Sequence, residues 1–217
     1  MRKNLYVIGA RGMGRDFICW CRMTPGVLDQ YRLCGFLDDD PAILDNYTGY
    51  PPIVGSAENF TPSKDDALFC AMGNVLPRIK YVEMLAEKGG NFDTFISPTA
   101  RISFSAHIGN GCFIWNDVVV GADVKINDHV MCQSNVVVGH DVTIGRYSVL
   151  DEGVTCCGFV RIGARTAVHT GAKVAPHVNI GDDAMIGIGS IVIRDVRDKH
   201  SVFGNPAREL LSPSKGS

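Results

Sequence analysis

The chain has 217 residues, a formal net charge of −2 and a hydrophobic fraction of 46%. This near-neutral balance offers no basic surface for nucleic acid or for an anionic membrane. The only apolar run near the start, residues 5–8, is too short for the core of a signal peptide or for a membrane span. We therefore expect a cytoplasmic protein that binds neither nucleic acid nor membrane.

Residues 4–95 alternate short apolar runs with helical stretches. The pattern predicts strands at 5–8, 31–37 and 67–71 and helices at 14–21 and 75–88, with a loop before the third strand. A β-α-β-loop-β-α order is typical of half of a nucleotide-binding parallel sheet. We assign residues 1–95 to a small α/β domain that is half-Rossmann-like.

A glycine-rich loop, Gly-Ala-Arg-Gly-Met-Gly-Arg at 9–15, joins the first strand to the first helix, and three aspartates follow the second strand. Free N–H groups at a helix N-terminus favour a phosphate, and an acidic residue roughly 20 positions later is typical of ribose binding. A domain this small has room for a mononucleotide fragment but not for a whole dinucleotide. The candidate substrate-binding residues are Gly9, Ala10, Arg11, Gly12, Gly14, Asp38 and Asp39. Alternatively, the glycines only form a tight turn, and the aspartates are only solvent-exposed residues of a loop.

Residues 96–197 consist of consecutive six-residue blocks. The first residue of each block is a branched aliphatic or a cysteine, and the fifth is small or β-branched. A period this short predicts coils that stack and share one core, with three blocks, or eighteen residues, per coil of a β-helix. A sandwich of ordinary strands would show a period of two. Glycine is common at the second position, where we expect a corner with positive φ.

A glycine-loop domain followed by this repeat resembles the hexapeptide-repeat sugar acetyltransferases of the sialic-acid and bacillosamine pathways (NeuD/PglD type). Three segments match motifs of that family: Gly-Phe-Leu-Asp-Asp at 35–39, Val-Gly-His-Asp at 138–141 and Gly-Asn-Pro-Ala-Arg at 204–208. The resemblance implies that residues 96–217 form a left-handed parallel β-helix that binds acetyl-CoA, while the front domain binds a nucleotide-sugar.

The resemblance also implies roles for individual residues. His140 would be the general base and Asp141 its partner, although Asp141 could equally be a simple corner residue. The coil length places Ala122 and Gly158 on either side of His140, which would leave a slot for a pantetheine arm. Gln133 stands where the family has an asparagine that contacts the acceptor, Val149 replaces a second histidine, and Met13 replaces a histidine of the glycine loop. The candidate acetyl-CoA residues are Gly158, Gly171, Gly189, Asn205 and Pro206.

These features predict direct transfer of an acetyl group from acetyl-CoA to an amino group of a nucleotide-linked deoxy-amino-sugar. O-acetylation of a sugar hydroxyl and a non-catalytic scaffold are the alternatives. A zinc enzyme of the γ-carbonic anhydrase type is disfavoured because the six histidines contain no H-x4-H pair, so we expect no metal. The eight cysteines contain no C-x-x-C pair, which favours a reduced compartment.

We also expect a homotrimer with active sites between subunits, as the resemblance implies. The β-helix sequence supports this expectation through five residues that should point outward on the early coils. They would form an exposed apolar patch on a monomer: Phe104, Phe113, Trp115, Met131 and Val149.

Overall fold

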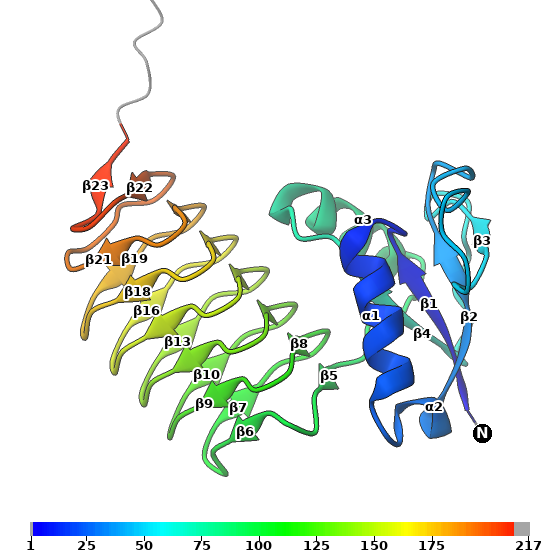
Figure 1. Ribbon diagram of the computed structural model, residues 1–217, viewed down its shortest axis with the longest axis horizontal. Coiled ribbons are helices and arrows are strands. Elements are labelled where there is room, and N and C mark those ends of the chain that lie inside the picture. The colour runs from blue at the N-terminus through cyan, green and yellow to red at the C-terminus, as the bar shows by residue number, and fades with distance from the viewer. Residues whose placement is uncertain (1, 211–217) are drawn as a thin grey trace, which may run out of the picture. The chain divides into compact units, whose positions relative to one another are not determined.

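A computed structural model describes residues 2–210 of the chain (Figure 1). The chain divides into two compact units, Met1–Asp93 and Thr94–Ser217.

The first unit contains a four-stranded parallel sheet with the strand order β3-β2-β1-β4. Its elements in chain order are β1 (Lys3–Ile8), α1 (Gly12–Met23), α2 (Val27–Gln30), β2 (Tyr31–Leu37), β3 (Ile53–Gly55), β4 (Asp66–Cys70) and α3 (Val75–Glu87). The predicted α/β fold is confirmed. The three-residue edge strand β3 and the single helical turn α2 were not predicted from the sequence pattern.

Aromatic packing fixes the first helix on this sheet. Helix α1 buries Phe17, Ile18 and Cys21, a spacing that places them on one helix face. The Phe17 ring stacks on Phe69 of β4, with 3.8 Å between ring centroids. The N-terminus of α1, and the glycine loop before it, are thereby held at the carboxyl end of β1.

The second unit is a left-handed parallel β-helix whose short strands stack in three sheets (Figure 1). The first sheet holds β7 (His107–Ile108), β10 (Lys125–Ile126), β13 (Thr143–Ile144), β16 (Arg161–Ile162) and β19 (Asn179–Ile180). The second holds β6 (Arg101–Ile102), β9 (Val119–Val120), β12 (Val137–Val138), β15 (Thr155–Cys156), β18 (Lys173–Val174) and β21 (Ile191–Val192). The third holds β5 (Phe95–Ile96), β8 (Phe113–Ile114), β11 (Met131–Cys132), β14 (Val149–Leu150), β17 (Ala167–Val168), β20 (Met185–Ile186), β22 (Ser201–Phe203) and the antiparallel β23 (Arg208–Glu209).

The strand register confirms the predicted coil length. Met131 pairs with Val149 and Val137 pairs with Thr155, in each case a residue eighteen positions later. The buried core consists of the first and fifth residues of the blocks, as the pattern of large first residues and small fifth residues predicts. Because every coil repeats this register, residues eighteen apart lie one above another along three edges.

We name these edges by their turn residues. The His140 edge comprises the turns 121–124, 139–142, 157–160 and 175–178. The Gln133 edge comprises the turns 115–118, 133–136, 151–154, 169–172 and 187–190. The remaining turns, including 145–148, 163–166 and 181–184, form the third edge.

The predicted reason for glycine at the second position is wrong. Positive φ occurs at the fourth residue of the blocks, for example at Asp117, Asn135 and Asp141. The second residue is instead where the next coil comes closest: a Cβ added to Gly139 would lie 2.9 Å from the Cys156 carbonyl oxygen. Glycine there permits the close stacking of coils, and it adopts ordinary φ values.

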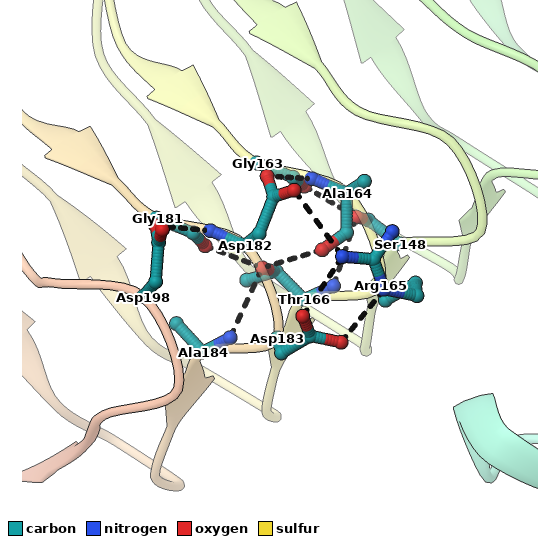
Figure 2. A network of polar contacts seen from close by, with 10 residues as sticks. All are labelled: Ser148, Gly163, Ala164, Arg165, Thr166, Gly181, Asp182, Asp183, Ala184 and Asp198. Carbon is teal, nitrogen blue, oxygen red and sulfur yellow. Dashed lines mark hydrogen bonds and ion pairs between the residues drawn. The ribbon is translucent and has the colours of Figure 1, made fainter.

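A polar network on the third edge shows how polar groups of the turns are hydrogen-bonded (Figure 2). The Asp182 carboxylate accepts a 2.8 Å hydrogen bond from the backbone N–H of Ala164, one coil earlier, and the Asp198 carboxylate does the same for Asp182. Inside the edge, the Thr166 hydroxyl donates to the Gly181 carbonyl at 2.7 Å. Polar residues at core positions of this edge therefore have partners in the next coil.

The structure does not contain the predicted apolar patch. Phe113, Met131 and Val149 are buried, and Trp115 is half-buried. The first three lie side by side on successive strands, in register, so that each covers its neighbours. Of the five residues only Phe104 is fully exposed.

Candidate active site

His140 and Asp141 form a hydrogen-bonded pair on the His140 edge. The two residues follow strand β12, and the His140 Nδ1 lies 2.8 Å from the Asp141 Oδ2. Because a carboxylate only accepts, Nδ1 carries the proton, and Nε2 of the neutral imidazole has a free lone pair. Nε2 makes no hydrogen bond to any residue from 2 to 210. Asp141 also has a φ of 58°, so it serves as corner residue and as partner of the imidazole.

Gly158 lies directly against the His140 ring. A Cβ at Gly158 would be 2.6 Å from both Cε1 and Nε2 of His140. The space expected beside the imidazole is therefore partly filled by the ring itself. A larger residue at 158 would displace the ring from its present position.

The backbone N–H of Gly158 has no acceptor among the residues that the structure describes. The third edge shows the contrast, because there an aspartate one coil later accepts the equivalent N–H of Ala164 (Figure 2). Above Gly158 the corresponding residue is Pro176, whose side chain contains no acceptor. An imidazole with a free lone pair and an unpaired N–H donor thus lie next to each other.

Phe159 was missed by the sequence analysis. Its ring meets the His140 ring edge to face at 5.0 Å and stacks on His177 at 4.8 Å. Phe159 has a φ of 64° and is 45% exposed, an uncommon conformation for a bulky residue and one that costs of order 1–3 kcal/mol. Other fourth-position residues, such as Tyr147, also have positive φ, so the fold imposes this conformation. What distinguishes Phe159 is the contact of its ring with His140, and the sequence showed it only as an aromatic at a fourth position.

We expect Phe159→Asn to preserve or raise stability and to slow turnover about tenfold. Asparagine tolerates positive φ, whereas loss of the ring would free the imidazole to leave its position. Thermal unfolding and steady-state kinetics measure the two effects. Lys199→Asn is the matched control because Lys199 has a φ of 62° but lies elsewhere; equal loss of activity in both variants would contradict a role for the ring.

Other predicted residues of the β-helix do not lie beside His140 within one chain. Gln133, Gly171 and Gly189 are on the Gln133 edge. The closing loop with Asn205 and Pro206 is tied near the same edge, because the N–H of Gly204 donates to the Ser190 hydroxyl at 3.1 Å. The candidate site residues are thus divided between two edges of the prism.

The first unit contains a pocket of about 710 Å³ at the carboxyl ends of β1 and β2. Four of the predicted residues line it, namely Gly9, Arg11, Asp38 and Asp39, together with Asn74 and Tyr81. Ala10, Gly12 and Gly14 do not. The pocket volume is in the range of small-molecule sites.

Asp38 and Asp39 have different surroundings in this pocket. Asp38 accepts the backbone N–H of Ala10 at 2.8 Å and that of Asp40 at 3.1 Å, so it holds the glycine loop. Asp39 accepts from the Tyr81 hydroxyl at 2.7 Å. This hydrogen bond, with burial, raises the pKa of Tyr81 to about 12. Within residues 2–210, Asp39 accepts no hydrogen bond from a backbone N–H, so of the two carboxylates it is the better placed to bind a ligand.

Cys132 and Cys156 are buried in the core of the β-helix, and no metal cluster occurs in the described part of the chain. Burial raises the pKa of Cys156 to about 12 and that of Cys132 further, which keeps both as thiols. No group of three or more histidine, cysteine or acidic side chains within residues 2–210 could hold a metal ion. No helix in that range is long and apolar enough to cross a membrane.

A hexapeptide β-helix with an imidazole–carboxylate pair at one corner, preceded by a glycine-loop α/β unit, resembles acetyltransferases of known structure. Residues 4–85 match the family model of the PglD N-terminal domain. The solved structures that resemble nearly the whole chain include two acetyltransferases. The acetyltransferase domain of PglB from Neisseria gonorrhoeae, in complex with acetyl coenzyme A, is 28% identical with a TM-score of 0.86, covering 97% of this chain and 100% of that one.

Perosamine N-acetyltransferase from Caulobacter crescentus is the second. A histidine-to-asparagine mutant of that enzyme, in complex with CoA and GDP-perosamine, is 26% identical with a TM-score of 0.85, covering 96% of this chain and 97% of that one. No curated protein matches the sequence. The predicted resemblance to NeuD/PglD-type hexapeptide acetyltransferases is confirmed.

Proposed function

We propose that the protein is an acetyl-CoA-dependent sugar acetyltransferase that N-acetylates a nucleotide-linked deoxy-amino-sugar, with His140 as general base. The observation that carries the proposal is the His140–Asp141 pair beside the N–H of Gly158, which has no acceptor within residues 2–210. A base with a free lone pair and an adjacent N–H donor are the two groups that acyl transfer requires.

In the proposed reaction the acceptor nitrogen attacks the thioester carbonyl carbon as His140 Nε2 removes a proton from it. The carbonyl electrons move to oxygen, where the Gly158 N–H stabilises the negative charge. Collapse of this intermediate re-forms the carbonyl and breaks the carbon–sulfur bond, and the departing CoA thiolate takes the proton from His140. Asp141 holds the ring and stabilises the imidazolium between these steps.

Two observations support a nucleotide-sugar as acceptor. The first unit has a pocket whose lining includes the Asp39 carboxylate and the glycine loop. The Caulobacter relative is named as an N-acetyltransferase and was crystallised with a GDP-sugar, which favours N- over O-acetylation. The same structures hold acetyl-CoA or CoA, and we place this cosubstrate along Gly158, Gly171, Gly189, Asn205 and Pro206.

Thermal shift with UDP-, dTDP-, GDP- and CMP-sugars tests the acceptor class. At about 100 times its Kd, the correct nucleotide should stabilise the protein by about 2.7 kcal/mol, which raises Tm by several degrees. Asp39→Asn should reduce this shift, whereas Asp45→Asn, on an exposed carboxylate outside the pocket lining, should not. If free amino sugars were acetylated and no nucleotide shifted Tm, the first unit would be a structural cap.

We further propose a homotrimer. The division of the candidate residues between two edges supports it, because two chains placed edge to edge would bring the two sets together. Light scattering should give about three times the chain mass of 23.5 kDa. A stable monomer at micromolar concentration would contradict a site shared between subunits.

A further inference from the structure

Two aromatic side chains follow His140 along the His140 edge, on successive coils. Phe159 and His177 occupy the fourth position of their blocks, eighteen residues apart. Their rings are stacked, with 4.8 Å between centroids and 4° between ring planes. The Phe159 ring in turn meets the His140 ring edge to face, at 5.0 Å and 88°. We call these three side chains the aromatic column. It connects the proposed general base to a residue one coil beyond Gly158.

The turns themselves do not require aromatic residues. Their fourth position has positive φ, and the two coils before Phe159 place short aspartates there, Asp123 and Asp141. Aspartate and asparagine adopt this conformation more readily than bulky residues do. Phe159 and His177 nevertheless adopt it, each with a φ of 64°. The two rings therefore add contacts that the backbone of the turn does not need.

The backbone of the solenoid places the two rings at stacking distance. The N–H of Phe159 donates to the His140 carbonyl oxygen at 3.0 Å. The N–H of His177 donates to the Gly158 carbonyl oxygen at 3.1 Å. These bonds hold successive fourth positions one coil apart, which is about 4.8 Å in a β-structure. Because aromatic pairs attract each other at about 4.5–7 Å between centroids, the coils preorganise the stack.

The His140 ring is only partly held by its hydrogen bond to Asp141. The His140 side chain is 57% exposed and that of Asp141 43% exposed, so solvent surrounds much of the pair. The bond at Nδ1 fixes one point of the ring, and the ring can still tilt about that point. The edge-to-face contact with Phe159 restricts this tilt and so determines where Nε2 points. Phe159 is itself 45% exposed, and within residues 2–210 its one other ring contact is the stack with His177.

We propose that His177 is a positioning residue, which holds the Phe159 ring and through it the plane of the His140 imidazole. This inference rests on the proposed function, in which Nε2 of His140 removes a proton from the acceptor. A base must point at the proton that it removes, and a small displacement of a reacting group slows a reaction strongly. His177 therefore contributes to turnover through the stack and not by proton transfer.

Two substitutions at position 177 separate stacking from imidazole chemistry. Because asparagine tolerates positive φ, His177→Asn should keep the fold. It should lower kcat about three- to tenfold and leave KM for both substrates within about twofold. His177→Phe restores a stacking ring, which Phe159 shows that this edge can hold at a φ of 64°, and it should keep at least about half of the wild-type kcat. Equal loss of activity in both variants would overturn the proposal, because the imidazole group and not the stack would then matter.

A double-mutant cycle tests whether His177 acts through Phe159. The kcat of the double variant Phe159→Asn/His177→Asn should lie within about twofold of that of Phe159→Asn alone. Independent effects would multiply, and that result would contradict the connected column. The matched control is His129→Asn, on the third edge, where His129 has a φ of 57° and stacks on Tyr147 at 5.0 Å and 8°. It should leave kcat unchanged.

NMR of the ligand-free protein with isotope-labelled histidine provides a readout that needs no substrate. The ring signals of His140 are identified by their absence in His140→Ala. They should shift in His177→Asn, return toward the wild-type positions in His177→Phe and stay in place in His129→Asn. Unmoved signals and an unchanged kcat in His177→Asn would overturn the proposal. If the signals moved but His140→Ala kept full kcat, the proposed function would be refuted in its choice of base, whereas the positioning of the ring by His177 would be confirmed.

Discussion

Replacing His140 with alanine should reduce kcat by roughly 10²- to 10⁴-fold, the usual contribution of a positioned general base. The His140 side chain is 57% exposed, so its removal should cost little packing energy. Acetyl-CoA binding and the oligomeric state should therefore remain unchanged while the chemical step slows. Steady-state kinetics and calorimetry with acetyl-CoA measure these quantities separately.

The control for this variant is His107→Ala, which removes an exposed imidazole from β7, in a different sheet from the β12 strand that precedes His140. It should retain full activity. If His140→Ala kept more than half of the wild-type kcat, His140 would not be the base, and proton loss would have to be assisted by Asp141 or by the substrate.

Gly14→Ala should strongly destabilise the first unit. A Cβ at Gly14 would overlap the backbone carbonyl oxygen of Gly9, and a backbone atom cannot move aside as a side chain can. The loop is also fixed by the Ala10 N–H bond to Asp38. We expect a loss of about 1–3 kcal/mol or more, together with loss of nucleotide binding, measured by urea denaturation and thermal shift.

Gly12→Ala provides the comparison for stability within the same loop. No atom lies within 4 Å of a Cβ placed at Gly12, the first residue of α1. Alanine should be neutral or stabilise the helix by up to about 1 kcal/mol. Similar destabilisation by both substitutions would show that the contact with Gly9 is not the cause.

The fold of the second unit was predictable because its six-residue sequence repeat is regular. A six-residue repeat fixes which side chains enter the core, and the register of eighteen follows from three blocks per coil. The edge strand β3 was not predictable, since its three residues follow two prolines and are held by pairing with β2 rather than by their own pattern. The role of the second-position glycines could not be predicted either. A glycine in the sequence is compatible both with positive φ and with the close approach of another coil, and only the structure distinguishes the two.

The candidate site was only partly predictable. The motif at 138–141 identified His140 and Asp141, and the coil length placed Gly158 beside them. Phe159 was not predicted, because its contact with the His140 ring depends on the conformation of the turn. Sequence motifs name residues one at a time, whereas the division of the site between two edges depends on how the coils stack.

The most direct test of the account is acetyl transfer by the wild-type protein from acetyl-CoA to the nucleotide-linked amino sugars of the panel. CoA release would be followed together with the mass of the product. We predict that at least one nucleotide-linked amino sugar gains a single acetyl group on nitrogen, and that the matching free sugar reacts far more slowly. Acetylation of a hydroxyl group would contradict the proposed acceptor atom, and the absence of transfer to any sugar would contradict the proposed activity.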